Sequence, residues 1–419
     1  MTSLTAPPRD RFRWSQLVYD TRYRSYTIQL IALALFLAFL GWVVHNTLQN
    51  LANAGKDLDF SFLTHTAGYK INQTLIAYSP ESTYLRAAVV GLLNTLLVAF
   101  LGCVSATIIG TLIGILRLSR NWLVARLATA YVEVFRNVPL LLWLLLTMAI
   151  LTEILPAPKA FRGADAAASM LLFDSTAITN RGIYVPMPQF AAGPDDFPVF
   201  GGALNIDLGL LSVLVVLVGG LHVSRRIRRW ADHRQNVSGI RPVTWYWQFA
   251  ALAVPILLLF YVYGLHFDYP ELRGFNFKGG LRLRNSLIAL WVALGLYTAA
   301  FIAEIVRGGI LAISGGQWEA AAALGLKRTL TMRLVILPQA LRVIIPPAIS
   351  QYLSLTKNTS LAVAVGYMDI TSTLGGITMN QTGRELECIL LLMLVYLTIS
   401  LLISLGLNLY NRRVRLVER

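Results

Sequence analysis

The chain has 419 residues, of which 56% are hydrophobic and only 14% are charged. A water-soluble globular protein usually carries about 25% charged residues, so this composition excludes an ordinary soluble protein. The net charge of +15 would suit a nucleic-acid-binding protein, but the basic residues lie between long apolar stretches, where they orient a membrane protein instead.

Eight predominantly apolar stretches approach the about 20 residues that an α-helix needs to cross a bilayer core. They are residues 27–44, 87–116, 128–155, 208–223, 245–265, 286–305, 343–365 and 386–407. The fourth is short and could be a re-entrant segment. The sequence therefore predicts an all-α polytopic membrane protein with about eight transmembrane helices.

The distribution of Lys and Arg predicts how these helices are oriented. With the N-terminus in the cytoplasm, the inner segments hold 23 of the 36 basic residues and the outer segments hold 11. The remaining two, Arg136 and Lys357, lie inside predicted spans. This excess of basic residues on one side predicts that both termini are cytoplasmic. We interpret the first apolar stretch as a retained helix and not as a cleaved signal peptide.

Motifs of familiar catalytic sites are missing from the sequence. It contains no Gly-x4-Gly-Lys-Ser/Thr loop for phosphate, no His-Glu-x-x-His metal motif and no Gly-x-Ser-x-Gly nucleophile elbow. The longest stretch without a span, 156–207, is rich in proline and too short for a catalytic domain. We therefore expect no reaction performed by this chain alone, and no cofactor or metal bound to it.

The segment between the sixth and seventh spans predicts a short helix on the cytoplasmic face. Ser314 stands three residues before Gln317, the spacing of a capping box, and Glu319 suits the positive end of the helix dipole. Residues 320–323 are all Ala, and Gly325 can end the helix in the left-handed conformation. Such a helix could be a plain connector, but its small side chains would also let another protein approach closely.

The spacing within this segment resembles the EAA loop of permease subunits of ABC importers. Glu319-Ala320-Ala321 is followed after three residues by Gly325, and after nine more by Val335-x-Leu337-Pro338. The family consensus has Ile where this chain has Val335. The match is long and position-specific, so it favours a docking element over a plain connector.

Four further segments resemble the polar amino acid uptake family of these permeases. They are FRNVPLL at 135–141, AEIVRGG at 303–309, LPQALR at 337–342 and LTKNTSL at 355–361. The extra first span and an insertion at about 156–282 are similar to the general L-amino acid permease branch. The resemblance covers roughly residues 87–155 and 283–407.

The resemblance implies a domain organisation around a type I ABC importer permease core. Residues 1–86 would form a cytoplasmic N-terminus, an extra transmembrane helix and an external loop. Residues 87–408 would form the ABC transmembrane type-1 domain, interrupted by the insertion with its two extra helices. Residues 409–419 would form a basic cytoplasmic tail.

The resemblance also implies a function and partners. The chain would be a transport subunit of the bacterial inner membrane and not an enzyme, forming half of a path for L-amino acids. A second homologous permease, a periplasmic binding protein and a separate ATPase dimer that binds ATP and Mg²⁺ would complete the importer. The coupling helix would contact this ATPase through residues in and beside the EAA segment: Ser314, Gln317, Glu319, Ala320, Ala321, Gly325, Lys327 and Arg328.

Ionisable residues inside spans are costly, so each is a candidate for function. Pro346-Pro347 is expected to break the seventh span, and the segment that follows could meet a substrate carboxylate through Lys357, Asn358, Thr359 and Ser360. Lys357 could instead snorkel or cap backbone carbonyls.

Arg136, followed closely by Pro139, is a further candidate near a bend at the cytoplasmic entrance. Glu133 and Arg136 are three residues apart on a helix, as are Glu304 and Arg307, which permits local ion pairs. An ion-coupled secondary amino acid transporter remains an alternative function, because such proteins also use broken helices and buried charges. A membrane scaffold or receptor is a third class, but it would not need Lys357 in a kinked span.

Overall fold

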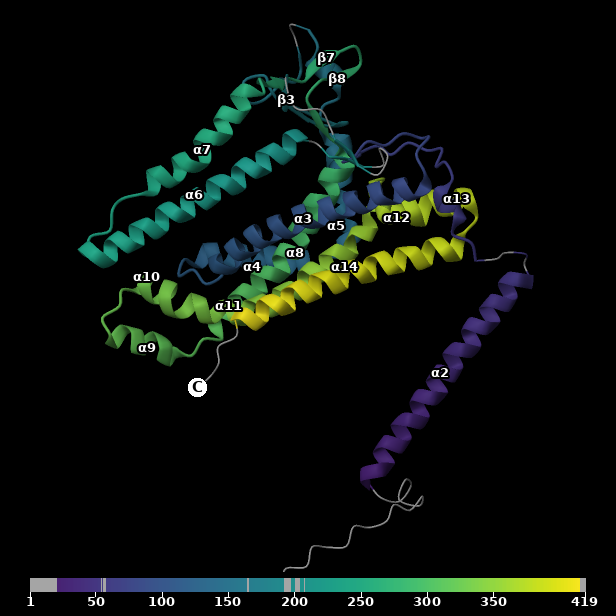
Figure 1. Cartoon of the computed structure of the whole chain (residues 1–419), viewed down its shortest axis with the longest axis horizontal. Coiled ribbons are helices and arrows are strands. Elements are labelled where there is room, and N and C mark those ends of the chain that lie inside the picture. The colour runs from purple at the N-terminus through teal and green to yellow at the C-terminus, as the bar shows by residue number, and fades with distance from the viewer. Residues whose placement is uncertain are drawn as a thin grey trace, which may run out of the picture.

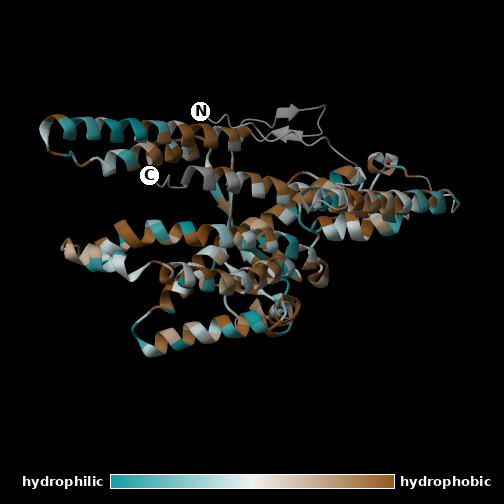
Figure 2. Cartoon of the chain, turned by 90° about the horizontal axis from the view of Figure 1, so that it is seen from below, coloured by the Kyte–Doolittle hydropathy of each residue, from teal (hydrophilic) through white to brown (hydrophobic). Residues whose placement is uncertain are grey.

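The computed structural model of the chain is a bundle of long helices with small antiparallel strands at one end (Figure 1). The backbone is described for residues 21–53, 55, 58–163, 166–191, 197–199, 204–206 and 208–414. The predictions about the cytoplasmic segment before residue 21 and about the tail from 415 to 419 lie outside these residues. Hydrophobic residues cover most of the long helices (Figure 2).

The first predicted span lies within helix α2, Thr21–Asn53. This helix stands apart from the bundle (Figure 1), and no residue of its most apolar window is buried against the rest of the chain. A short 3₁₀ helix, η1 (Ser61–Thr64), follows it. Because the apolar window of α2 packs on nothing in this chain, lipid or a partner subunit must cover it.

The centre of the bundle is the pair formed by α3 (Tyr84–Leu116) and α8 (Asn285–Leu311). Small residues let the two backbones approach closely. A Cβ added at Gly110 would lie 2.8 Å from the Ala299 carbonyl oxygen, and one at Gly114 would lie 2.7 Å from that of Ala303. Helix α8 is the most deeply buried candidate span, with 67% of its apolar window covered.

The third predicted span is broken into two helices, α4 (Trp122–Asn137) and α5 (Leu140–Ala149), bent by 104°. The break falls at Val138 and Pro139, so the predicted bend at Pro139 is confirmed. Val138 has an extended backbone, as is usual before proline. A single π-helical turn, η2 (Ile150–Ile154), extends α5.

The seventh predicted span belongs to a longer helical run from Arg328 to Val365. It consists of α10 (Arg328–Thr331), the π turn η4 (Met332–Ile336), α11 (Leu337–Asn358) and the 3₁₀ helix η5 (Thr359–Val365). The predicted break at Pro346-Pro347 is wrong, because α11 runs through both prolines. Neighbouring helices make proline tolerable inside membrane helices, and the irregularity begins at Thr359.

The chain then returns through short helices to the last span. These are α12 (Ile370–Ser372), the π turn η6 (Thr373–Thr378), α13 (Met379–Thr382) and the long α14 (Glu385–Val414). A second apolar cluster joins the start of α14 to the loop after α2, with Phe62, Tyr69 and Ile71 packed among residues that include Tyr84 and Cys388.

The chain is mostly helical, as predicted, and its short strands lie in the insertion. After η3 (Pro158–Phe161) it forms a three-stranded antiparallel sheet in the order β1-β2-β9 and three two-stranded pairs, β3-β6, β4-β5 and β7-β8. The strands are β1 (Ala177–Thr179), β2 (Gly182–Val185), β3 (Met187–Phe190), β4 (Phe197–Val199), β5 (Leu204–Ile206), β6 (Leu265–Asp268), β7 (Glu271–Arg273), β8 (Asn276–Lys278) and β9 (Leu281–Leu283).

Two antiparallel helices, α6 (Leu208–Ser238) and α7 (Trp245–Val262), complete the insertion. The sequence predicts about eight spans, and six helices of the described residues are long and apolar enough to cross a membrane, or seven with the bent α4–α5 pair. Helix α6 is not among them, because its apolar part, 208–223, is shorter than the about 20 residues of a full span.

Candidate coupling loop and translocation path

The predicted coupling helix is present as α9 (Gly315–Ala323), three residues after the end of α8. Ser314 occupies the N-cap position, but its side chain makes no capping hydrogen bond, so the predicted capping box is wrong. The carboxamide of Gln317 is engaged elsewhere, because its Oε1 accepts a hydrogen bond of 3.1 Å from Nε2 of Gln339. Gln339 lies near the start of α11, so this bond ties α9 to that helix.

Gly325 ends α9 in the left-handed conformation, with φ of +72°, as predicted. The N–H of Gly325 donates to the Ala322 carbonyl at 2.9 Å, and the N–H of Leu326 donates to the Ala321 carbonyl at 3.1 Å. These two bonds are those of a Schellman motif, which satisfies carbonyls at a helix end. The end of α9 is therefore fixed by its own backbone.

The surface of α9 is small and partly apolar. Ala321 is buried, whereas Glu319 and Ala320 are exposed. Leu324 is 80% exposed at the tip of the loop, which gives this surface an apolar knob. Small side chains around one exposed Leu form a surface on which another protein can pack.

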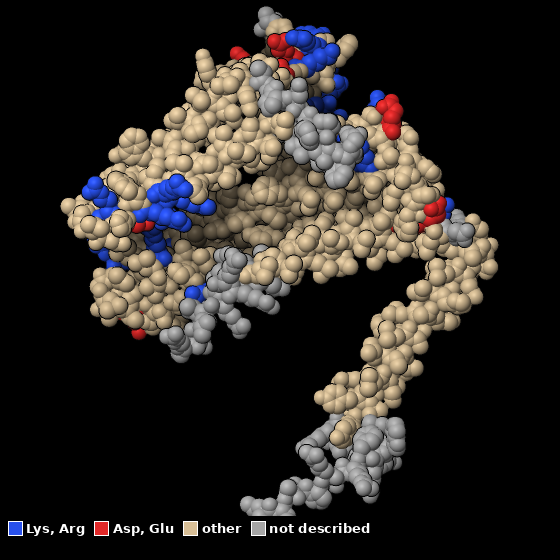
Figure 3. Space-filling model, in the orientation of Figure 1, with Lys and Arg blue, Asp and Glu red and all other residues tan. Residues whose placement is uncertain are grey.

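Two basic residues follow the turn. Lys327 is the N-cap residue of α10, and the guanidinium of Arg328 lies 6.0 Å from the ring centroid of Trp318. The loop lies at the same end of the bundle as the turn between α6 and α7 (Figure 1). Lys and Arg side chains gather at this end in Figure 3.

An ion cluster stands close to the loop, at the ends of α3 and α8. Glu304 binds Arg307 at 2.6 Å, so the ion pair permitted by their spacing forms. Glu304 also accepts a hydrogen bond from Arg117, which is only 10% exposed. Glu304 thus joins the two central helices just before α8 leads into the coupling loop.

Arg136 lies at the end of α4 and is not paired with Glu133 among the described residues. Its guanidinium lies 5.4 Å from the ring centroid of Phe301 on α8, a cation–π contact. The neighbouring Phe135 stacks on Trp143 of α5 with centroids 4.2 Å apart. These contacts fix the bend while leaving Arg136 exposed.

The other four path candidates form the junction between α11 and η5. Lys357 is exposed, and Asn358 and Ser360 are half-buried. Thr359 is fully buried, and its hydroxyl donates to the Thr356 carbonyl at 2.8 Å. Thr359 therefore stabilises the junction, and no hydrogen bond or ion pair of the described residues joins this junction to Arg136.

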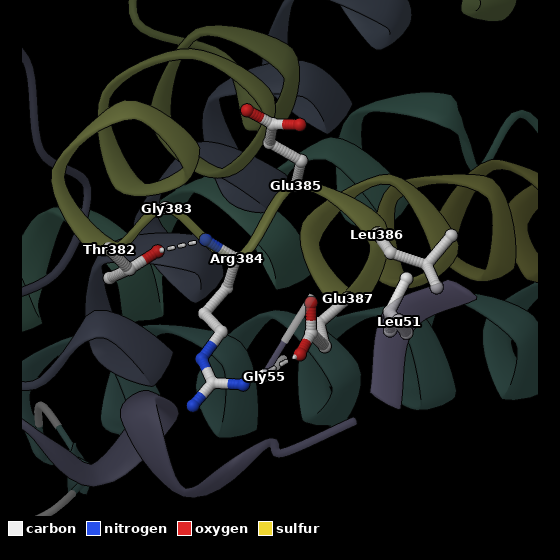
Figure 4. Close-up of a pocket in the computed structure, with 8 residues that line it drawn as sticks. All are labelled: Leu51, Gly55, Thr382, Gly383, Arg384, Glu385, Leu386 and Glu387. Carbon is white, nitrogen blue, oxygen red and sulfur yellow. Dashed lines mark hydrogen bonds and ion pairs between the residues drawn. The ribbon is translucent and has the colours of Figure 1, made fainter. Parts of the chain in front are cut away.

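A pocket of about 330 Å³ opens at the opposite end, between the end of α2 and the start of α14 (Figure 4). There Arg384 lies 3.2 Å from Glu387 and 3.6 Å from Asp59. The pKa of Asp59 lies below its usual range, because its carboxylate accepts hydrogen bonds from the Ser61 hydroxyl and N–H and lies near the positive charge of Arg384. These contacts fasten the segment after α2 to α14.

Comparison with known families gives a clear assignment. The family described as the binding-protein-dependent transport system inner membrane component matches residues 106–416. This chain belongs to that family. It is a multi-pass membrane permease subunit of an ABC importer, and the family implies an ATPase and a binding protein as its partners.

Relatives of the permease are similar over its full length. It is 55% identical, over 100% of both chains, to the glutamate/glutamine/aspartate/asparagine transport system permease protein BztB of Rhodobacter capsulatus. It is 44% identical to the general L-amino acid transport system permease protein AapQ of Rhizobium johnstonii, over 97% of this chain and 96% of the relative. The putative amino-acid ABC transporter permease protein YhdX of Escherichia coli is 44% identical, over 94% and 95% of the two chains.

Three side chains of the permease's coupling region were not identified from the sequence. Leu324 supplies the exposed knob, Gln339 ties α9 to α11, and Arg117 completes the ion cluster. A leucine between four alanines and a glycine is a signal for a docking surface. The Gln339 and Arg117 contacts join residues far apart in the chain, and no local pattern indicates them.

Proposed function

We propose that this permease forms one half of the translocation path of an ATP-driven importer for L-amino acids in a bacterial inner membrane. Both termini would be cytoplasmic, with the short apolar part of α6, packed on α7, as an additional span. A second, homologous permease subunit would complete the path, and a separate ATPase dimer would bind ATP and Mg²⁺. The single observation that carries the proposal is α9, a small, exposed and backbone-capped helix at the end of the bundle.

The position of α9 suits a coupling element. It is connected by three residues to α8, which packs on α3, α4, α5 and α11. On its other side it leads through α10 and η4 into α11. A force applied to α9 by an ATPase would therefore act on α8, one of the two central helices, and on α11, which packs on α8. An ion-coupled transporter has no use for such a surface.

The substrate class is supported by two exposed cations and by the relatives' names. Arg136 and Lys357 are exposed although they lie in or beside spans. A charged side chain at membrane depth normally faces a wet path or a partner and not lipid. Both groups can bind the carboxylate that every amino acid carries. The relatives are named for transport of glutamate, glutamine, aspartate and asparagine, or of L-amino acids in general.

Reconstitution of the complex with its ATPase and binding protein tests the proposal. We expect uptake of labelled L-glutamate and L-glutamine that needs ATP on the α9 side, stops with vanadate and continues when ionophores collapse ion gradients. Uptake by the permease alone, driven by a proton or sodium gradient, would refute the ATP-driven importer and favour the secondary transporter.

Lys357→Ala tests the carboxylate-binding role within the same vesicles. A hydrogen bond to a charged group contributes about 1.5–3 kcal/mol, so we expect uptake at low substrate concentration to fall by about 10- to 100-fold, with Lys357→Arg retaining most of it. Lys278→Ala, which removes an exposed cation from β8, is the matched control. Unchanged uptake by Lys357→Ala would refute the carboxylate-binding role and favour a side chain that snorkels or caps backbone carbonyls.

A further inference from the structure

Helices α6 and α7 form a hairpin that is separate from the rest of the bundle. They pack on each other, and α7 also contacts β6, but neither shares a substantial interface with the helices of the core. Figure 1 shows the hairpin along one side of the molecule, with its turn at the end that carries α9. Something other than the permease core must therefore hold this hairpin in position.

Contacts along the hairpin establish which residues face each other. The hydroxyl of Tyr263 donates to Ser212 Oγ at 3.0 Å near one end. Further along, a Cβ added at Gly220 would lie 2.7 Å from the Ala251 carbonyl oxygen. Continuing this antiparallel register places the first residues of α7, beginning at Trp245, at the level of residues 225 and 226.

A dense group of arginines begins at that level. Between residues 224 and 244 the chain carries six arginines and a single acidic residue. The arginines are Arg225, Arg226, Arg228, Arg229, Arg234 and Arg241. Figure 2 shows the corresponding hairpin at its upper left, hydrophobic along one half and hydrophilic toward the turn.

Most of this charge is not neutralised within the chain. Arg241 pairs with Asp232 at 2.8 Å, and the guanidinium of Arg234 lies 5.8 Å from the ring centroid of Trp230. In the part of the chain that the structure describes, no ion pair involves the four arginines from 225 to 229, and all four are exposed. Figure 3 shows blue side chains gathered at this end of the hairpin.

Aromatic side chains surround the arginines. Trp245 is 70% exposed, Trp247 is 60% exposed and Trp230 is 53% exposed. Exposed Trp and Tyr side chains at a helix end are typical of the membrane–water interface. Arginines beside these interfacial aromatic side chains lie at the depth of lipid headgroups. At that depth their guanidinium groups match phosphate oxygens in geometry and charge.

The geometry points to a binding site for the phosphate groups of anionic lipids, formed by the arginine end of the α6–α7 hairpin in the leaflet on the α9 side. The helices below the arginines are apolar on their exposed faces and lie among the acyl chains. The headgroups bound at the turn replace the missing contacts with the core and fix the depth of the hairpin. Negative charge is the feature that selects the lipid, since a zwitterionic headgroup presents no net charge to the cluster.

Quenching of tryptophan fluorescence by brominated lipid measures this binding directly. The complete complex is placed in vesicles of phosphatidylcholine mixed with phosphatidylglycerol, with bromine on the acyl chains of one lipid or of the other. Subtracting the spectra of the Trp245→Phe/Trp247→Phe variant isolates the signal of these two side chains. Each basic residue near an anionic surface contributes about fivefold in affinity, the equivalent of about 1 kcal/mol. We therefore expect brominated phosphatidylglycerol to quench these tryptophans preferentially.

Paired variants distinguish a specific lipid site at the arginine end of the hairpin from a general effect of positive charge. Arg225→Ser/Arg226→Ser should lower the preference for phosphatidylglycerol by at least about tenfold, given about fivefold for each arginine, and Arg225→Lys/Arg226→Lys should retain most of it. Arg120→Ser/Arg126→Ser removes the same charge beside the α3–α4 turn and is the matched control, with no expected effect. High salt should weaken the preference.

Three results would overturn the inference. One is equal quenching by the two brominated lipids, and another is an equal loss of preference in the two serine variants. The third is the absence of quenching by either lipid in the assembled complex, because a partner protein would then cover the arginine end. Circular dichroism of each variant checks that the helices remain folded.

Discussion

Replacing Gly325 tests the coupling loop through a backbone effect whose size follows from the structure. Gly325 has φ of +72°, and nothing lies within 4 Å of the position of an added Cβ. A new side chain meets no clash, so its cost comes from the left-handed backbone alone, about 1–2 kcal/mol. That range corresponds to about a 5- to 30-fold shift away from the capped end of α9, since 1.4 kcal/mol is about tenfold.

A series of substitutions at this position should follow backbone preference. Gly325→Val should lower the amount of substrate transported per ATP hydrolysed by up to this factor, whereas Gly325→Asn should lower it less because Asn tolerates the left-handed region. The assay measures uptake and ATP hydrolysis in the same vesicles. Membrane insertion should not change, because the loop lies outside the spans.

Gly383 offers a matched control, since it has φ of +64° and nothing within 4 Å of an added Cβ, but it lies after α13 at the opposite end. Gly383→Val should cost a similar amount of local stability and leave coupling unchanged. An unchanged transport ratio in Gly325→Val, or the same loss in Gly383→Val, would refute the reasoning.

Three other perturbations test the packing around the site. Glu304→Gln should lower the unfolding free energy of the complex by about 1–3 kcal/mol, because it leaves the nearly buried Arg117 without a counter-charge, and thermal unfolding measures this loss. Gly110→Val should cost about 1–3 kcal/mol or more by overpacking against α8, seen as a lower melting temperature. Asp59 has a lowered pKa in the folded state, so its contribution to stability is present above its unfolded pKa of about 3.8 and is lost as pH falls through the lower folded value. The Ser61 amide donates to Asp59, so its protection against hydrogen exchange, relative to its intrinsic rate, should fall only in that acidic range.

Controls exist for each of these tests. Arg307→Gln should cost less than Glu304→Gln, because Arg307 is more exposed than Arg117. Gly219→Val should be tolerated, since an added Cβ at Gly219 meets nothing within 4 Å. Asp59→Asn should remove the acid dependence of the Ser61 amide. A reversed order in the first pair, or acid sensitivity that survives in Asp59→Asn, would contradict the assigned contacts.

Local and periodic features of the fold were predictable from the sequence. Apolar length located the spans, and the position of Gly325 located the end of α9 because only a left-handed residue suits that turn. The sequence also indicated the Glu304–Arg307 pair, whose partners are one helical turn apart. The coupling helix itself was predicted from residues close together in the sequence, namely Glu319-Ala320-Ala321 and Gly325.

Features that depend on distant segments were not predictable. Strands β2 and β9 pair Ile183 with Leu283, residues about a hundred positions apart, and neither strand has enough residues for a clear alternating pattern. Pro346 and Pro347 were expected to break a helix that neighbouring helices in fact stabilise. The Gln317 half of the predicted capping box is missing because the Gln317 carboxamide binds Gln339 on α11 instead.

The helical run from Arg328 to Val365 has a mechanical consequence. Its 38 residues extend about 57 Å at about 1.5 Å per residue, so a swing of about 10° would displace the far end by about 10 Å. Lys357 lies about 44 Å from the foot of the run, where α9 is attached, so the same swing would displace it by about 8 Å, a distance comparable to the size of an amino acid. A rigid helical run would therefore let a small movement of α9, caused by the ATPase, widen the translocation path at the other side of the membrane.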